Sequence, residues 1–221
     1  MNIKNGSRLV MIGDSITDVG RERPIGKPFK DQLGSGYVNL INSLILTSYP
    51  GSDICVLNVG CSGNKVTDLA ERWETDVIDL QPDWLSVMIG INDVWRQFDI
   101  PTEPQNHILI EQYTKVLDEL ISRTKPTLSG GLILMTPYFI ETNQDDEMRC
   151  LMDQYGKVVK SLAEKHNAIF VDVQAAFDKS LEHYHSSFIA WDRVHPSNHG
   201  HLIIAKAFLD AVDFDFYNND N

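Results

Sequence analysis

Five short apolar runs, separated by longer amphipathic stretches, set the strongest limit on how this 221-residue chain can fold. Each run has the length of one strand, and most lack the alternation of apolar and polar residues that a half-exposed strand shows. Continuous apolar runs are typical of strands in a parallel sheet that helices cover on both faces. The runs are Arg8–Ile12, Ile54–Val59, Trp84–Ile89, Leu132–Thr136 and Ala168–Val173.

Between these runs, apolar residues recur at helical spacing, which predicts helices over Tyr37–Tyr49, Asn106–Thr124, Asp145–His166 and His199–Val212. Strands that alternate with helices predict an α/β fold, an open, doubly wound parallel sheet of five strands with helices on both faces. We expect residues 1–213 to form a single domain and residues 214–221 to form a frayed C-terminal tail.

The charge of the chain argues against two classes of partner. There are 31 Asp and Glu residues against 19 Lys and Arg, which gives a formal net charge of -12. A chain this acidic would repel both nucleic-acid phosphates and anionic membrane surfaces. The longest apolar run near the N-terminus, Leu9–Ile12, is too short for a signal-peptide core or a membrane span. We therefore expect neither a nucleic-acid nor a membrane partner.

The cysteines, Cys55, Cys61 and Cys150, are odd in number and lack a Cys-x-x-Cys spacing, which argues against bound zinc and against a disulfide scaffold. Reduced thiols in the cytoplasm are the simplest interpretation. Cys61 lies in a glycine-rich loop and stays an alternative as a reactive thiol, although the chain offers a better nucleophile nearby.

In doubly wound folds, ligands bind outside the carboxyl ends of the strands, so the residues that follow each apolar run are the candidates for a site. Small, polar and catalytic residue types gather at these positions. The segments are Gly13–Thr17, Gly60–Asn64, Gly90–Asp93, Pro137-Tyr138 and Trp191–Pro196.

Ser15 is the candidate nucleophile, because it follows the first strand on a tight turn that Gly13 permits. Such a turn can raise a hydroxyl above the sheet and direct the following amides at a developing anion. The alternative is that Ser15, or Asp14 beside it, only caps the next helix.

Asp192 and His195 lie three residues apart, a spacing that lets the carboxylate reach Nδ1 of the imidazole. His195 would then accept a proton from a serine on Nε2, and Pro196 would restrict the loop. Two alternatives remain: a solvated helix N-terminus that Asp192 caps, and a metal site that combines these residues with His199 and His201.

Acyl transfer also needs hydrogen-bond donors for the oxyanion. The candidates are the backbone N–H groups of Ser15 and Gly60 and the side-chain amide of Asn92. Each also has a structural interpretation, Gly60 as a turn and Asn92 as an Asx-turn residue. Asp93 is interpreted as a loop brace rather than a catalytic group.

Four blocks together resemble the SGNH hydrolases, also called the GDSL esterase/lipase family. They are Gly13–Thr17, Gly60, Gly90–Asp93 and Asp192–His195, in family order and near family spacing. The resemblance implies a three-layer αβα flavodoxin-like fold and ester hydrolysis without a metal or cofactor. It makes Ser15 the nucleophile, His195 the base and Asp192 its partner, with Gly60 and Asn92 in the oxyanion hole.

Longer matches resemble the intracellular bacterial acetylxylan esterases of this family. They are residues 26–37, 88–97, 135–138, 152–156 and 190–197. This resemblance implies a homo-oligomer that acts on small acetylated saccharides, and with no export signal we expect short, imported substrates. For Trp95, Tyr138 and Trp191, core packing or a subunit interface is the alternative to sugar stacking. The residues expected to contact the substrate are Asp14, Asp93, Trp95, Arg96, Tyr138 and Trp191.

Other functions remain as alternatives. The main enzymatic one is a lysophospholipase or thioesterase that acts on longer acyl esters, since the family includes both. A sugar-binding protein with an inactive triad is the non-enzymatic one, because a fold does not fix a function. Nucleotide or flavin binding is disfavoured, because the chain lacks a phosphate-binding glycine loop.

Overall fold

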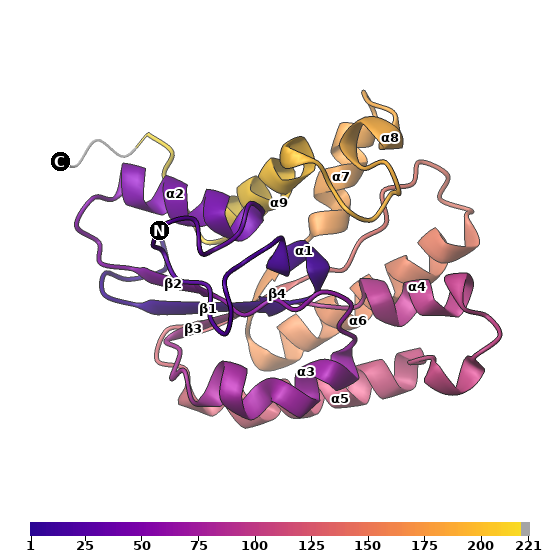
Figure 1. Ribbon diagram of the computed structural model, residues 1–221, viewed down its shortest axis with the longest axis horizontal. Helices are drawn as coiled ribbons and strands as arrows, with labels where there is room; N and C mark the ends of the chain where they lie inside the picture. The colour runs from indigo at the N-terminus through magenta and orange to yellow at the C-terminus, as the bar shows by residue number, and fades with distance from the viewer. Residues whose placement is uncertain (218–221) are drawn as a thin grey trace.

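A computed structural model of the protein describes residues 1–217, and its centre is a five-stranded sheet in which all pairings are parallel (Figure 1). The strand order is β2-β1-β3-β4-β5. Each strand falls on one of the five apolar runs, which confirms the predicted α/β fold class. The strands are β1 (Arg8–Gly13), β2 (Cys55–Asn58), β3 (Trp84–Met88), β4 (Gly131–Met135) and β5 (Ile169–Val171).

Helices form a layer on each side of the sheet. One layer holds α2 (Tyr37–Ser48) and α9 (Asn198–Ala211), with α7 (Val173–Leu181) beside α9, and the other holds α3 (Val66–Trp73), α5 (Ile110–Thr124) and α6 (Glu147–His166) (Figure 1). The shorter helices are α1 (Ser15–Asp18), α4 (Ile91–Asp99) and α8 (Ser186–Ile189). A π-helix, Glu74–Ile78, continues α3, and two 3₁₀ turns span Pro104–Asn106 and Lys125–Thr127.

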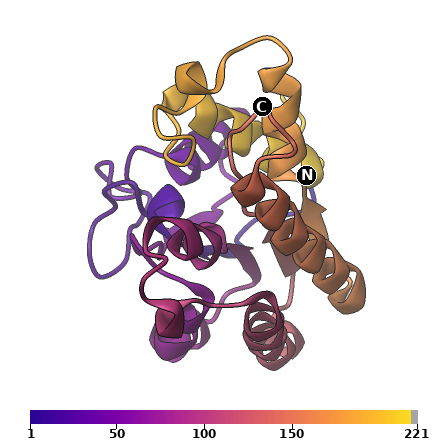
Figure 2. The same ribbon diagram turned by 90° about the vertical axis from the view of Figure 1, so that its right-hand side faces the viewer.

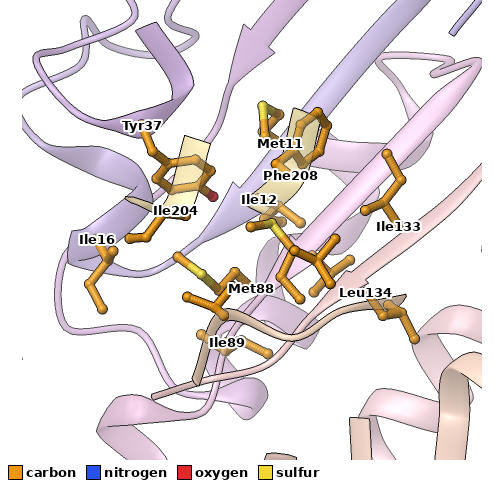
Figure 3. Packing of buried hydrophobic residues seen from close by; sticks show 14 of the residues in the cluster. Met11, Ile12, Ile16, Tyr37, Met88, Ile89, Ile133, Leu134, Ile204 and Phe208 are labelled. Carbon is orange, nitrogen blue, oxygen red and sulfur yellow. The ribbon is translucent and has the colours of Figure 1, made fainter. Parts of the chain in front are cut away.

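The central strands are buried from both sides, which explains their continuous apolar sequence. Residues 9–12 of β1 are fully buried. Figure 3 shows Met11 and Ile12 packed among side chains of the neighbouring strands and of α9, including Met88 and Phe208. Burying such side chains contributes about 1.5–3 kcal/mol each to folding, so a polar residue here would be costly.

The parallel register brings the carboxyl ends of the middle strands to one edge of the sheet, the end of the molecule that faces the viewer in Figure 2. Gly13 lies opposite Met88, and Met88 lies opposite Met135. The chain order reverses at β1, since β2 and β3 pair with its two sides. In doubly wound folds such a reversal leaves a crevice at the carboxyl ends of the strands, where ligands bind.

The C-terminal segment differs from the predicted frayed tail. Phe214 is buried, its ring packs edge-on against Tyr49 at a centroid distance of 5.2 Å, and the Asp215 amide donates to the Tyr49 hydroxyl. These contacts contradict a tail that begins at Phe214, while residues 218–221 of the prediction lie outside the described residues.

The single domain over residues 1–213 stays a prediction. Within residues 1–217, every helix is too short or too polar to cross a membrane.

His201, on the inner face of α9, is a buried titratable group near the site end of the sheet. Its side chain is 4% exposed, and its Nδ1 has no hydrogen-bond partner. It lies against Gly36, where a Cβ would be 3.2 Å from the imidazole Cε1. Burial, with a smaller contribution from the charge of His195, lowers the pKa of His201 to about 4.

We expect this histidine to destabilise the fold in acid. Between pH 6.5 and about 4 the unfolded chain binds a proton at His201 that the folded chain does not, so stability is lost as the pH falls. Relative to His201→Gln, the wild type should lose about 3 kcal/mol of unfolding free energy between pH 7 and pH 4, measured by urea denaturation. The exposed His183, replaced by Gln, is the control. Parallel pH profiles for the wild type and His201→Gln would contradict the assignment.

Candidate active site

The structure brings Ser15, His195 and Asp192 into one chain of contacts. Ser15, the first residue of α1, is 180 positions from His195, yet its Oγ lies 3.0 Å from Nε2 of the imidazole. Nδ1 of the same ring lies 2.6 Å from Oδ2 of Asp192. With the Nδ1 hydrogen donated to Asp192, Nε2 is the acceptor for the serine hydroxyl, the order of groups found in serine hydrolases.

The carboxylate of Asp192 is held in its charged form. Burial alone would raise its pKa, but the hydrogen bonds from the His195 side chain and from the backbone amides of His195 and Val194 outweigh burial and lower the pKa below its usual value. The two amides donate to Oδ1 at 2.8 and 3.0 Å, which leaves Oδ2 for the imidazole. Asp192 can therefore orient His195 and balance a positive charge on it.

Core contacts fix the loop that carries His195. The Tyr138 hydroxyl donates to the Val194 carbonyl at 3.1 Å, and the Ile140 amide donates to the Arg193 carbonyl at 2.9 Å. Tyr138 is fully buried and packs against Phe177 at 4.5 Å between ring centroids. Such a side chain cannot contact a substrate, so the prediction that Tyr138 binds one is wrong. It supports the loop instead.

The loop after β2 corrects a second prediction. The Gly60 amide donates to the Asn58 side-chain oxygen at 2.9 Å, and both residues are buried. A Cβ at Gly60 would collide with the backbone of Thr17 and Asp18, so the glycine serves the packing of this loop against α1. Because its N–H already has an acceptor, the prediction that Gly60 supplies an oxyanion donor is contradicted.

A different amide of this loop is left without an acceptor, because most of its neighbours are hydrogen-bonded. Cys61 donates to the Gly13 carbonyl, Ser62 donates to the Asp18 carboxylate, and Asn64 donates to the Cys61 carbonyl. Gly63 is exposed and has a φ of +84°. Among residues 60–64 it is the one residue whose amide donates none of the described hydrogen bonds. Its N–H is open to a ligand.

Asn92, in the first turn of α4, lies next to this loop. Its side-chain nitrogen donates to the Asn64 carbonyl at 3.1 Å, and its side-chain oxygen accepts from Arg96 at 3.3 Å. These bonds fix which end of the amide carries the hydrogens, and the nitrogen keeps a second N–H. The Ser15 amide likewise makes no hydrogen bond among the described residues.

Comparisons with known proteins agree with this geometry. Residues 11–203 match the GDSL-like Lipase/Acylhydrolase family. The chain belongs to this family. It is also 51% identical over 216 residues to an acetylxylan esterase of Geobacillus stearothermophilus, with 98% of each chain covered.

Solved structures of family members are closely similar. The crystal structure of Axe2, an acetylxylan esterase from Geobacillus stearothermophilus, has a TM-score of 0.97 at 50% identity and covers 99% of this chain and 100% of that chain. LAE5, an alpha/beta hydrolase enzyme from the metagenome of Lake Arreo, has a TM-score of 0.94 at 51% identity, with 96% of this chain and 98% of that chain covered.

Asp14 and Asp93 lie beneath the site of this GDSL-family protein rather than in it. Both are almost fully buried, and burial raises the pKa of each to about 7. Asp14 caps α1 by accepting from the Ile16 amide, and Asp93 accepts from the Val66 amide at the start of α3. Their burial contradicts the predicted contact with substrate. It agrees with the interpretations of Asp14 as a cap and Asp93 as a loop brace.

Of the remaining predicted contact residues, Trp191 is exposed, whereas Trp95 and Arg96 are half-buried. The Trp95 ring is 5.9 Å from that of His195, and the Arg96 guanidinium is 5.0 Å from the Trp95 ring. Arg96 also pairs with Asp99. Trp191 is 82% exposed, so its ring is available for contact.

Within residues 1–217, no group of three or more His, Cys, Asp or Glu side chains is placed to hold a metal ion.

Arg72 of α3 is a residue that the sequence interpretation missed. Its guanidinium donates to the carbonyls of Gly13 at 3.0 Å and Val59 at 2.7 Å and to the side-chain oxygen of Asn64 at 2.7 Å. Asp76 pairs with it from the next helical turn. Arg72 therefore joins the end of β1 to both ends of the loop after β2.

We expect Arg72 to position the open amides. Arg72→Lys keeps the charge but loses the fork that reaches three acceptors, so kcat on p-nitrophenyl acetate should fall roughly tenfold or more while KM changes little. The kcat from steady-state kinetics and the rate of fluorophosphonate labelling should both decrease. Arg123→Lys, which changes a half-exposed arginine paired with Glu74, is the control. Wild-type kcat in a folded Arg72→Lys variant would refute this role.

Proposed function

We propose that the protein is a serine esterase that removes acetyl groups from acetylated xylo-oligosaccharides or related sugars through a covalent acetyl-enzyme. The observation that carries this proposal is the contact chain Ser15–His195–Asp192 in a member of the GDSL family. The acetyl group and the saccharide are supported by the relative: solved variants of Axe2 are described as an acetyl-xylooligosaccharide esterase and share 49–51% identity with this chain.

In this proposal Ser15 is the nucleophile, His195 the base and Asp192 the residue that orients the base. The solved structures of Axe2 include variants described as catalytic mutants, in which a serine, a histidine and an aspartate are each replaced by alanine. In Axe2 that serine has the same position number as Ser15, and the aspartate and histidine are three positions apart, as Asp192 and His195 are.

The oxyanion would be bound by the amides of Ser15 and Gly63 and by the side-chain N–H of Asn92. The support is that these three donors stay open where the neighbouring amides of the loop are hydrogen-bonded. Donors held in place before the reaction stabilise developing charge without reorganisation, and losing one of them typically costs 10²–10³ in turnover.

The reaction would proceed in two halves. His195 takes the proton of Ser15 as the hydroxyl oxygen bonds to the acetyl carbonyl carbon, and the carbonyl oxygen becomes the oxyanion. The C–O bond to the sugar then breaks, and His195 returns the proton to the leaving sugar oxygen. Water, losing its proton to the same imidazole, attacks the acetyl-enzyme, and acetate leaves while Ser15 regains its hydrogen.

We further propose that the protein forms homo-oligomers in a reducing, cytoplasmic compartment. The first point is supported by exposed aromatic side chains. Phe188 is 61% and Tyr184 47% exposed, and the two rings stack at 5.2 Å with His199 edge-on to both. The second is supported by three free cysteines. Exposed aromatic groups of this kind are typical of protein interfaces.

The substrate assignment predicts a preference for short acyl groups. We expect p-nitrophenyl acetate to be hydrolysed with a kcat/KM about tenfold or more above that of p-nitrophenyl palmitate, together with acetate release from acetylated xylo-oligosaccharides. Ser15→Ala should abolish both activities and fluorophosphonate labelling, whereas Ser43→Ala, at an exposed position on α2, should keep them. Activity confined to the long-chain ester would favour the lysophospholipase or thioesterase alternative.

The oligomer proposal predicts a mass in sedimentation velocity that is a multiple of the 25.0 kDa chain. Phe188→Arg should lower this mass, because a charge replaces an exposed aromatic ring. Lys30→Arg, which changes no charge at another surface position, should not. A wild-type mass of one chain at micromolar concentration would contradict the proposal.

A further inference from the structure

A groove of about 450 Å³ begins at Asp192 and extends away from Ser15, His195 and Asp192 between α4 and the first turn of α6. These two helices approach each other at the right-hand end of the molecule in Figure 1. The groove, called the α4–α6 groove below, is within the usual size range of small-molecule sites. The lining residues on which the argument depends are Trp95, Phe98, Asp146, Glu147, Asp192 and Arg193.

The α4–α6 groove is continuous with the site already described. Asp192 lines it and also binds His195, and the Trp95 ring lies edge-on to the imidazole at 5.9 Å. A molecule whose ester lies at Ser15 therefore has this groove available for the part that extends past His195. Three other lining residues, Phe98, Asp146 and Glu147, have no role in the proposed chemistry.

The lining combines aromatic rings with carboxylates. Phe98 is 37% exposed on α4, and Phe139 lies below the Arg193 guanidinium at 4.9 Å. Aromatic faces can stack on the apolar face of a sugar ring, and carboxylates accept hydrogen bonds from hydroxyl groups. A long acyl chain would instead bury the exposed carboxylate of Glu147, which has no described hydrogen-bond partner, and this burial is unfavourable.

The charges of the α4–α6 groove are predominantly negative. Its one lining cation, Arg193, pairs with Glu141 at 2.5 Å. Asp99 is paired with Arg96, and Asp146 caps α6 by accepting from the Arg149 amide. Glu147 is exposed and has no described ion pair. An anionic ligand in the groove would therefore lie near carboxylates that no cation neutralises, and it would find no unpaired cation among the lining residues.

We propose that the α4–α6 groove binds the saccharide part of the substrate and that its carboxylates select neutral saccharides over those that carry a uronic acid. This inference rests on the proposed deacetylation of saccharides. Phe98 supplies a stacking surface beyond Trp95, and Glu147 supplies both an acceptor for hydroxyl groups and the repulsion of a sugar carboxylate.

The experiment compares three substrates: p-nitrophenyl acetate, a neutral acetylated xylo-oligosaccharide, and one of the same length with a glucuronic acid branch. The ratio of kcat/KM for the neutral oligosaccharide to that for p-nitrophenyl acetate should fall about two- to tenfold in Phe98→Ala, the range for loss of one aromatic contact. Phe29→Ala, at an exposed phenylalanine outside the groove, should leave this ratio at the wild-type value.

The wild type should prefer the neutral oligosaccharide to the branched one. Glu147→Gln should reduce this preference about two- to fivefold, an effect that weakens as the salt concentration is raised. Glu71→Gln, at an exposed position on α3, should not change it. Glu147 is chosen over Asp146 because Asp146 caps α6.

Failure of this inference and failure of the proposed function give different results. If the wild type releases no acetate from either oligosaccharide, the proposed function is wrong and this inference is wrong with it. If the wild type deacetylates the oligosaccharides but Phe98→Ala and Glu147→Gln match it in both ratios, only the groove assignment is overturned. A selective loss of activity on p-nitrophenyl octanoate in Phe98→Ala would also overturn it, because the groove would then bind the acyl chain.

Discussion

The absence of a Cβ at Gly13 is the constraint on which the site of this protein depends. A Cβ there would collide with the Thr17 side chain and with the Met88 carbonyl of the neighbouring strand. Without it, β1 passes into α1 within two residues, and Ser15 lies directly above the edge of the sheet. The Gly13 carbonyl can then accept hydrogen bonds from both the Cys61 amide and Arg72. A glycine at the end of the central strand thus fixes the serine and the neighbouring loop together.

The rest of the site is set by hydrogen bonds that hold loops rather than by groups that react. Asp18 receives the amide and hydroxyl of Ser62 and the guanidinium of Arg23, and these bonds lower its pKa against the effect of burial. Tyr138 holds the loop of His195 by a hydrogen bond to the Val194 carbonyl, and Asp93 holds the start of α3 by accepting from the Val66 amide. Such supports restrict the reacting groups to one geometry, which is a large part of what an enzyme contributes to rate.

Much of this arrangement could be predicted from the sequence, because the predictions rested on local patterns. Apolar runs located all five strands to within two residues at each end, since a strand buried on both faces must be apolar throughout. The contact between Asp192 and His195 could be predicted because the two residues lie three positions apart in the sequence, close enough for the carboxylate to reach the imidazole. The contact between Ser15 and His195 followed only from the topology and the family resemblance.

What could not be predicted depends on long-range partners. A sequence does not show that the Asn58 side chain occupies the Gly60 amide, or that Tyr138 lies in the core rather than at the surface. Arg72 belongs to no motif, and its role depends on three acceptors, one at the end of β1 and two in the loop after β2. The helices α1 and α8 are a single turn each, too short to show a periodic apolar face.

The single open amide at Gly63 has a consequence for what this fold can bind. Phosphate-binding loops present several consecutive N–H groups, which surround an anion that has several oxygen atoms. In the loop after β2, the hydrogen bonds of Gly60, Cys61, Ser62 and Asn64 leave one N–H for a ligand. Such a loop is suited to one charged oxygen atom at a time. The loop after β2 is rich in glycine and lies at the edge of a flavodoxin-like sheet, yet it is unsuited to nucleotide phosphates because its own hydrogen bonds occupy most of its N–H groups.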